Sequence, residues 1–264
     1  MAVQKLPEIT PPELDDDSLQ FYYDSHPTEE DLMGDSYPQF NLIFYLVSVL
    51  RWFYQKQDWL IAANLSIYQT GYYKEPPVEP DVAFFNGVVL TEEETANLKS
   101  WKMKLGKSRP APTVVFEISS DKTWKNDLGH KIIRYQQLGV KEYFAYDPNS
   151  PQYWPDKPVR LKGWRYEGEQ IIELTADKKG WLWSEELESW LKPDRKFLRL
   201  YDQNRQLRLT EGEAGQLQAD QEQTKAVQEQ RRADQEQAKA LEEQNAKMKA
   251  WAKLRELGID PEKL

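Results

Sequence analysis

Residues 114–147 read "VVFEISSDKTWKNDLGHKIIRYQQLGVKEYFAYD", and this stretch decides the fold. The apolar run at 113–118 predicts a buried strand, and residues 124–138 carry a helical pattern. Gly139 follows directly and is typical of a helix end, because glycine readily adopts the left-handed backbone that closes a helix. The run "EYFAYD" at 142–147 predicts the next strand. The stretch therefore indicates a strand, a helix and a second strand in succession.

Patterns on both sides extend this unit into a domain. Upstream, we expect a helix, two strands and a second helix, at 37–57, 59–69, 82–89 and 91–99. Downstream, we expect two strand pairs, at 160–175 and 197–209. Strands and helices in this order favour the α/β (α+β) class, with a mixed sheet flanked by helices.

Charge divides the chain unevenly. Residues 13–35 hold nine acidic side chains and no Lys or Arg, which predicts an acidic N-terminal arm over 1–35. Residues 36–213 hold 25 basic and 24 acidic side chains, so the formal net charge of −9 does not describe the central domain, which we expect over 36–212. Global charge therefore neither predicts nor excludes a nucleic-acid partner for that domain.

The remaining segment, 213–264, predicts a helical tail. Within it, "ADQEQTKAVQEQRR" and "ADQEQAKALEEQNA" align at a period of 14 with nine identical positions, which is a period of two heptads. Val227, Leu241 and Met248 keep a seven-residue register, but other positions of that register are charged. Two interpretations stay open. The tail is either a coiled-coil or docking helix, through which the chain could form a homodimer, or a solvated single helix.

Composition limits the other classes of site. Cysteine is absent, which removes disulfides and thiolate metal sites, and the only histidines, His26 and His130, are too few for a histidine-rich zinc site. The N-terminus has no signal-peptide pattern, and the most apolar run, at 40–50, is too short to span a bilayer. We expect a soluble, cytoplasmic protein.

Two carboxylates stand beside or within the predicted strands. Asp81 follows a proline and precedes the apolar run at 82–85, and Glu117 lies inside the run at 113–118. A buried glutamate is costly unless it has a partner. Carboxylates on adjacent strands can hold a hard cation such as Mg²⁺ (or Mn²⁺) through oxygen, and the main-chain carbonyl of Ile118 could add a ligand.

The predicted helix after Glu117 supplies a cation. Asp127, Lys131 and Tyr135 are spaced at i, i+4 and i+8, so they share one helix face. A metal at the carboxylates would polarise a phosphoryl oxygen, and Lys131 would stabilise charge that develops in the transition state. The pattern therefore favours phosphodiester hydrolysis, with Asp81, Glu117 and Lys131 as candidate catalytic residues.

Residues 38–147 resemble the Uma-type family of putative restriction endonucleases, within the P-D…(D/E)-x-K nuclease superfamily. The matching segments are "EPDVAFF", "VVFEISS" and, most specifically, "NDLGHKIIRYQQLGVKEYFAYDP". The segment "LRELGIDPE" at 254–262 resembles the end of the helical tail that members commonly carry. The resemblance implies a restriction-endonuclease-like core and Mg²⁺-dependent hydrolysis of DNA.

The resemblance also implies roles for particular residues. Asp81 and Glu117 match the metal carboxylates. Ser119 stands where the superfamily signature has its lysine, and the family carries a lysine in the downstream helix instead, here Lys131. Many members have a histidine or glutamate near the start of the first helix, where this chain has Gln39.

Each candidate also has a structural interpretation. Asp81 suits a turn, and Glu117 could form an ion pair with Lys131 or Arg134. Asp127 could cap its helix or orient Lys131.

Two basic features compete for a functional role. Lys122, on the loop after Ser119, is a rival for the catalytic cation. A basic run is either a solvated loop or a phosphate-backbone contact, and it comprises Lys99, Lys102, Lys104, Lys107 and Arg109. For the whole chain, the alternative to an endonuclease is a catalytically weak or inactive nuclease-fold module that binds nucleic acid or assembles through its C-terminal helix.

Overall fold

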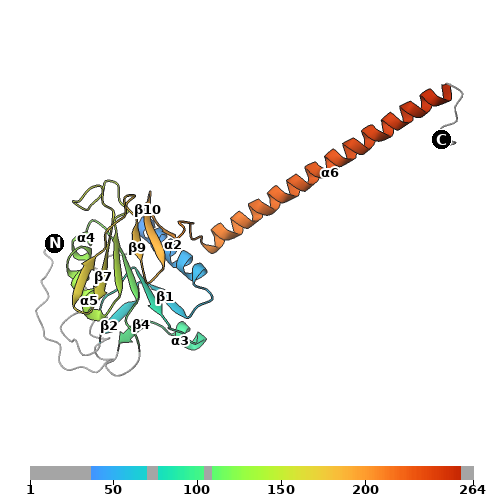
Figure 1. The fold of residues 1–264 in the computed structure, drawn as a ribbon. Helices are drawn as coiled ribbons and strands as arrows, with labels where there is room; N and C mark the ends of the chain where they lie inside the picture. Colours follow the sequence, from blue (N-terminus) through green and yellow to red (C-terminus); the bar gives the residue numbers. More distant parts are fainter. Residues whose placement is uncertain (1–36, 70–76, 104–108, 257–264) are drawn as a thin grey trace, which may run out of the picture. The chain divides into compact units, whose positions relative to one another are not determined.

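The computed structural model describes residues 37–69, 77–103 and 109–256, and these form two units that divide between Glu211 and Gly212. The first unit combines β-sheets with helices, and the second is a single long helix (Figure 1). The α+β class expected from the sequence is therefore confirmed. The predicted acidic arm and His26 lie outside the described residues.

A six-stranded sheet forms the centre of the first unit. Its strands, in spatial order, are β1 (Trp59–Ala63), β3 (Val82–Asn86), β5 (Val114–Ile118), β6 (Glu142–Tyr146), β7 (Leu161–Glu167) and β8 (Gln170–Glu173). Neighbours β5 and β6 are parallel, and the other neighbouring pairs are antiparallel. The sheet is therefore mixed, as the sequence predicted.

The helical stretch between β5 and β6 is broken into two helices, α4 (Trp124–Asp127) and α5 (His130–Leu138). The break falls at Gly129, where an added Cβ would lie 2.8 Å from the main-chain oxygen of Lys125. The end of α5 is as expected, since Gly139 adopts the left-handed backbone at φ 83°. A similar local break separates β1 from β2 (Ser66–Gln69), because Asn64 has φ 47°.

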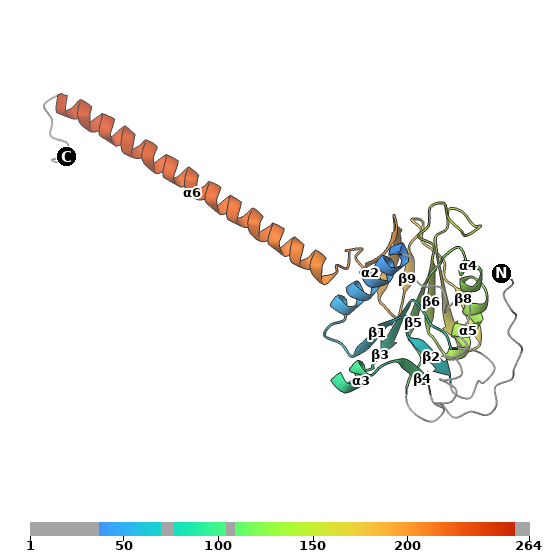
Figure 2. The same cartoon turned by 180° about the vertical axis from the view of Figure 1, so that it is seen from behind.

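Alternation along β5 assigns its side chains to two different cores. Val114, Phe116 and Ile118 pack on the side covered by α2 (Tyr37–Phe53), whereas Val115 packs with Tyr135 on the side of α5. Figure 2 shows α2 on one side of the sheet and α4 and α5 on the other. Glu117, two residues after Val115, therefore faces α5.

A second sheet packs on the α2 side. It contains β9 (Leu182–Ser184), β10 (Ser189–Asp194) and β11 (Phe197–Tyr201), in the order β11-β10-β9. The expected strand pair over 197–209 is found in part. Its first strand is β11, and the chain turns back beside it through the antiparallel bridge between Tyr201 and Leu207 and the main-chain bond from Arg208 N–H to the oxygen of Leu200 at 2.9 Å, but the returning segment forms no strand of its own. The main partner of β11 is β10, which the sequence pattern did not predict.

Two smaller elements complete the first unit. The helix expected at 91–99 is α3 (Glu92–Ala96), and Thr91 begins it by forming a capping box with Glu94. The strand β4 (Ser100–Met103) pairs with β2 in parallel. Neither element contributes a candidate catalytic residue.

The second unit is α6 (Glu211–Glu256), a helix of 46 residues with no buried side chain. Among the described residues, no helix is both long enough and apolar enough to cross a membrane. The cytoplasmic location expected from the sequence stays a prediction.

Candidate functional site

The two strand carboxylates lie at the same end of the central sheet. In the antiparallel pair of β3 and β5, Val82 is opposite Phe116, so Asp81 and Glu117 occupy the next opposed positions. Both are buried, with exposed fractions of 8% and 3%. The main-chain N–H of Ile118 donates to Asp81 Oδ2 at 2.5 Å, which fixes the aspartate against β5.

The shared face of α5 meets Glu117 from the other side. Lys131 Nζ lies 3.2 Å from Glu117 Oε2 and 3.2 Å from Asp127 Oδ1. The hydroxyl of Tyr135 donates to Glu117 Oε1. The structure thus brings together Asp127, Lys131 and Tyr135, although Asp127 ends α4 and the other two lie on α5. Lys131 and Tyr135 contact Glu117, and Asp127 contacts Lys131.

Ser119 does not leave a gap where the superfamily has its lysine. Its hydroxyl donates to Asp127 Oδ2 at 2.7 Å, and the hydroxyl of Thr123 donates to the same oxygen at 3.1 Å. Asp127 is the last residue of α4 and is 1% exposed. Of its two sequence interpretations, the contact with Lys131 is therefore the one observed, and Ser119 supports that contact.

Burial dominates the electrostatics of Glu117. It raises the pKa of this carboxyl well above its usual range, and the nearby charges of Asp81 and Asp127 raise the pKa further. The Lys131 ammonium and the hydroxyl of Tyr135 lower it, but their effect is smaller than that of burial. The charged form of Glu117 is therefore disfavoured in this setting, and a cation bound beside it would favour that form.

The oxygen atoms present suit a small divalent cation. Mg²⁺ is commonly held by one or two carboxylates and keeps several waters, so Asp81, Glu117 and the carbonyl of Ile118 form an adequate set. Gln39 Nε2, in the first turn of α2, donates to this carbonyl at 3.3 Å. Since a carbonyl oxygen has two lone pairs, that bond is compatible with a ligand role. Among the described residues, no group of three or more His, Cys, Asp and Glu side chains forms a ready-made cation site.

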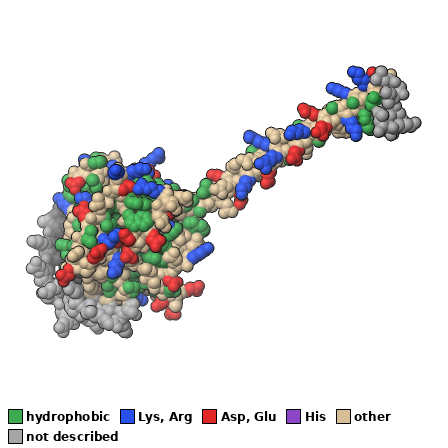
Figure 3. All heavy atoms as spheres, in the orientation of Figure 1, with side chains coloured by type: hydrophobic (Ala, Val, Ile, Leu, Met, Phe, Trp, Pro, Cys, Tyr) green, Lys and Arg blue, Asp and Glu red, His purple; other side chains and the backbone are tan. Residues whose placement is uncertain are grey.

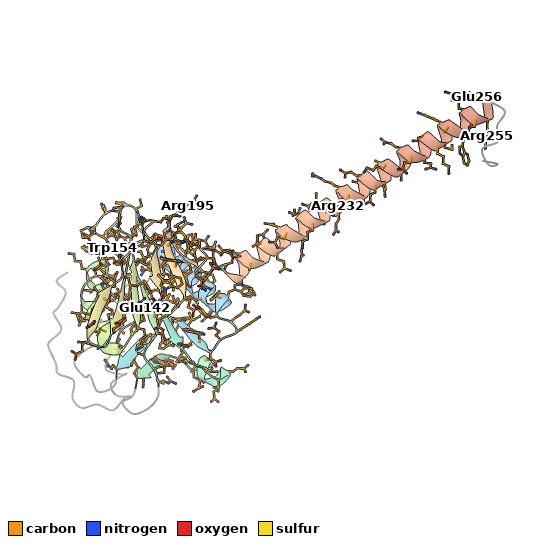
Figure 4. The ribbon with its side chains drawn as sticks, in the orientation of Figure 1. Glu142, Trp154, Arg195, Arg232, Arg255 and Glu256 are labelled. Atoms are coloured by element: carbon orange, nitrogen blue, oxygen red, sulfur yellow. The ribbon has the colours of Figure 1, made fainter. Side chains whose placement is uncertain are left out.

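The loop after β6 supports the site in a way that the sequence pattern did not predict. Asn149 Nδ2 donates to the carbonyl of Ser119 at 3.0 Å and to Asp147 Oδ1 at 2.9 Å. Asp147 in turn accepts the main-chain N–H of Trp154 at 3.0 Å. Figure 4 labels Trp154 near this end of the sheet and Glu142 at the start of β6. Turn-forming residues in "YDPNS" signalled a loop, but no spacing linked Asn149 to Ser119.

The competing residues lie elsewhere. Lys122 is exposed on the turn before α4, and His130 is exposed on α5. Arg134, the other sequence candidate for an ion pair with Glu117, directs Nη1 to the side-chain oxygen of Gln69 at 3.3 Å.

Part of the basic run lies at the far end of β3 from Asp81. Trp101, within that run, packs on Phe85 with ring centroids 4.7 Å apart, and Arg109 lies 4.6 Å from the centroid of Trp101. Lys104 and Lys107 lie outside the described residues. Arg109 is therefore poorly placed to contact the phosphates nearest the candidate site.

The chain is thus an α+β protein whose mixed sheet has two buried acids at one end, with a lysine from the adjoining helix beside them. The chain belongs to the Uma2 family, described as putative restriction endonucleases, since the family model matches residues 35–186. The resemblance drawn from the sequence motifs is thereby confirmed, and family membership supports a nuclease.

One solved structure with a similar chain is that of a putative nuclease belonging to DUF820 from Anabaena variabilis ATCC 29413. The two sequences are 13% identical, and the alignment covers 59% of this chain and 75% of that chain with a TM-score of 0.42. Among curated proteins, none matches the chain.

Proposed function

We propose that the protein is a Mg²⁺-dependent endonuclease that hydrolyses phosphodiester bonds in DNA. The observation that carries this proposal is the direct contact of Lys131 with Glu117, at 3.2 Å, beside the opposed carboxylate of Asp81. Two acids and one ammonium at a sheet end are the groups that metal-assisted phosphodiester cleavage needs. In this proposal the domain over 36–212 performs the chemistry and the tail over 213–264 does not.

Asp81, Glu117 and the carbonyl of Ile118 would hold the cation. When bound, a divalent cation supplies Lewis-acid polarisation of a phosphoryl oxygen and activation of the attacking water. Lys131 places positive charge where the phosphoryl oxygens gain negative charge in the transition state. Asp127 holds that ammonium in place, and the buried setting strengthens each of these interactions because water screens them weakly.

The lysine therefore acts from a helix rather than from the strand. Ser119 occupies the usual strand position, and its hydroxyl orients Asp127, which contacts Lys131 at 3.2 Å. The ammonium reaches Glu117 by this route instead of through a side chain two residues along β5.

Cleavage of supercoiled plasmid with Mg²⁺ or Mn²⁺ tests the proposal. We expect Asp81→Asn, Glu117→Gln and Lys131→Met each to lower the cleavage rate by about 100-fold or more, because each removes a charge used in the transition state. Lys122→Met is the matched control, since Lys122 is an exposed lysine close in sequence to the site. Equal traces of cleavage by all four variants and the wild type would indicate a contaminating nuclease and would refute the catalytic assignment.

The exposed seam of α6 favours a second candidate function, assembly of a nuclease-fold module through its tail. Val227, Leu241 and Met248 repeat at seven-residue spacing and are 47%, 60% and 65% exposed. Three residues after each stand Gln230, Gln244 and Trp251, so the seam is largely polar. Polar seam positions weaken a coiled coil but fix its register.

Deletion of 214–264 tests this second candidate by its effect on mass. We expect the full chain to have the mass of a dimer in light scattering and the truncated chain that of a monomer. An identical oligomeric state for both chains would remove the tail from any role in assembly. Cleavage by a truncated monomer would separate the two functions.

A further inference from the structure

The β10–β11 hairpin is anchored at the same end of the sheet as the candidate site. The hydroxyl of Tyr146 donates to the main-chain oxygens of Arg195 and Phe197, at 3.4 Å and 3.1 Å. Tyr146 is the last residue of β6, and its partner across the parallel pair is Ile118. The hairpin turn therefore lies beside the strand ends that carry the site, on the α2 side of the sheet.

This hairpin concentrates positive charge. Residues 192–199, "KPDRKFLR", contain four basic side chains and one acid. Lys192 and Arg199 are directly opposite each other in the strand register, and Arg195 and Lys196 are exposed at the turn. Like charges directly opposite on two strands destabilise a sheet.

Aromatic rings hold the two strand cations in fixed positions. Lys192 Nζ lies 5.3 Å from the ring centroid of Trp181. The guanidinium of Arg199 lies 4.9 Å from the ring centroid of Tyr45 and donates to its hydroxyl at 3.0 Å. Cation–π contacts of this kind restrain the position of a charged group. In Figure 3, Lys and Arg side chains gather over this end of the unit, where Figure 4 labels Arg195.

We propose that this basic hairpin, formed by Lys192, Arg195, Lys196 and Arg199, contacts the phosphate backbone of the DNA strand bound at the candidate site. The proposal rests on the proposed function for the identity of the substrate. A nucleic-acid strand is the extended polyanion whose phosphates several spaced cations can neutralise at once. The family match ends at residue 186, so the hairpin lies beyond the segment that defines the family.

The geometry also separates the hairpin from the rival basic run. Trp101 and Arg109 of that run lie beside Phe85, at the far end of β3 from Asp81, whereas the hairpin is bonded to the last residue of β6. Glu117 faces α5 and the hairpin lies on the α2 side, so the hairpin contacts phosphates that flank the cleaved one. We therefore expect it to contribute binding energy and not chemistry.

DNA binding without cleavage tests the hairpin directly. Fluorescence anisotropy with a labelled duplex, in Ca²⁺ instead of Mg²⁺, gives the binding constant over a series of NaCl concentrations. The turn variant is Arg195→Gln/Lys196→Gln, in which both side chains keep a similar length and lose their charge. The matched control is Lys99→Gln/Lys141→Gln, which removes two exposed lysines at the other end of the sheet. A charge-preserving variant, Arg195→Lys/Lys196→Arg, completes the set.

We expect the plot of log binding constant against log salt to become shallower by about 1.8 in the turn variant, at about 0.9 per lost phosphate contact. The control and the charge-preserving variant should keep the wild-type slope. An unchanged slope in the turn variant, an equal loss in the control, or a wild type that binds no duplex would overturn the hairpin assignment.

The two proposals fail in different ways. A wild type that binds DNA through the hairpin but cleaves nothing with Mg²⁺ or Mn²⁺ would refute the nuclease and leave the hairpin assignment supported. A wild type that cleaves DNA would support the nuclease. If the turn variant then bound DNA with the same affinity and the same salt dependence as the wild type, the hairpin assignment would be refuted.

Discussion

Removal of the Lys131 ammonium gives the most direct test of the site, because it needs no substrate. Lys131→Met keeps an apolar side chain of similar shape but leaves Glu117 and Asp127 without the cation that lies 3.2 Å from each. One such pair has a gross attraction of about 5 kcal/mol at an effective dielectric constant of about 20. Desolvation offsets much of that attraction, and breaking a buried pair by removing one partner costs about 3–5 kcal/mol.

We expect the lower end of that range, because Glu117 can take up a proton when its partner is lost. A loss of about 3 kcal/mol in a domain of this size lowers the melting temperature by about 6–12 °C. The loss must also depend on pH. Burial already raises the pKa of Glu117 above the ordinary value of 4.5, and without Lys131 the pKa rises further. A carboxyl whose pKa is higher in the folded state loses stability as pH rises through that folded pKa.

Thermal and urea unfolding in EDTA, at a series of pH values, measures this dependence. The deficit of Lys131→Met relative to the wild type should be small near the ordinary pKa of Glu117 and should grow toward about pH 8. Added Mg²⁺ should raise the melting temperature of this variant more than that of the wild type, because a cation at Asp81 and Glu117 restores positive charge. Lys122→Met, an exposed control, should change stability by less than about 0.5 kcal/mol.

A double variant tests whether the negative charge of Glu117 causes the loss of stability in Lys131→Met. Glu117→Gln added to Lys131→Met removes one of the two stranded charges, so we expect recovery of about 1 kcal/mol or more. Wild-type stability of Lys131→Met at every pH would show that the ion pair contributes nothing. A double variant less stable than Lys131→Met would show that the negative charge of Glu117 is not what destabilises the single variant.

Three further changes probe other parts of the chain. Asp127→Asn keeps the shape of the side chain but removes the charge that positions Lys131. The kcat for cleavage should therefore fall by about 10- to 100-fold, with KM nearly unchanged. A change in KM alone would contradict this role of Asp127. Hydrogen bonds from a main-chain N–H and from a neighbouring guanidinium lower the pKa of Asp177 to about 2 from its usual 3.8. Its contribution to stability is therefore present above the usual value and is lost as pH falls toward 2, so urea unfolding of Asp177→Asn should match the wild type only in strong acid. Gly163→Ala places a Cβ 2.7 Å from the Phe144 ring and should cost about 1–3 kcal/mol in urea unfolding. Gly215→Ala meets no atom within 4 Å and should cost nothing, and equal losses for both glycine variants would refute the packing argument.

The central sheet could be predicted from sequence wherever one face of a strand is fully buried. The run at 113–118 is apolar on both faces, and β5 is indeed buried throughout. The strand pairing after residue 180 was harder to predict from the sequence, because the strands there are short and only half-buried. In β10 and β11, buried and partly exposed positions alternate, and such a pattern indicates a strand without naming its partner. The strand β11 pairs with β10 along its whole length and meets the following segment at one bridge, and Leu198 and Leu200 pack into the core on the α2 side.

The candidate site was predictable to the extent that helix geometry is regular. Spacing alone put Asp127, Lys131 and Tyr135 on one face, and in the structure Lys131 and Tyr135 contact Glu117 while Asp127 contacts Lys131. The supporting bonds of Asn149 and Gln39 were not predictable, because they join residues 30 and 79 positions apart that no periodic pattern relates. The same holds for the hairpin, whose position beside the site depends on the hydroxyl of Tyr146.

In the proposed site, a lysine on the helix in place of one on the strand changes what the arrangement depends on. A lysine on β5 would be fixed by strand pairing, whereas Lys131 is fixed by the rotation of α5 about its own axis. One residue of shift in α5 would turn its side chains by about 100°, since a turn contains about 3.6 residues. The bond from Tyr135 to Glu117 ties α5 to β5, and the bond from Ser119 to Asp127 ties α4 to the end of the same strand. In the proposed site, Ser119 therefore helps to place the ammonium from the strand position of the usual lysine, because its hydroxyl holds the aspartate that contacts Lys131.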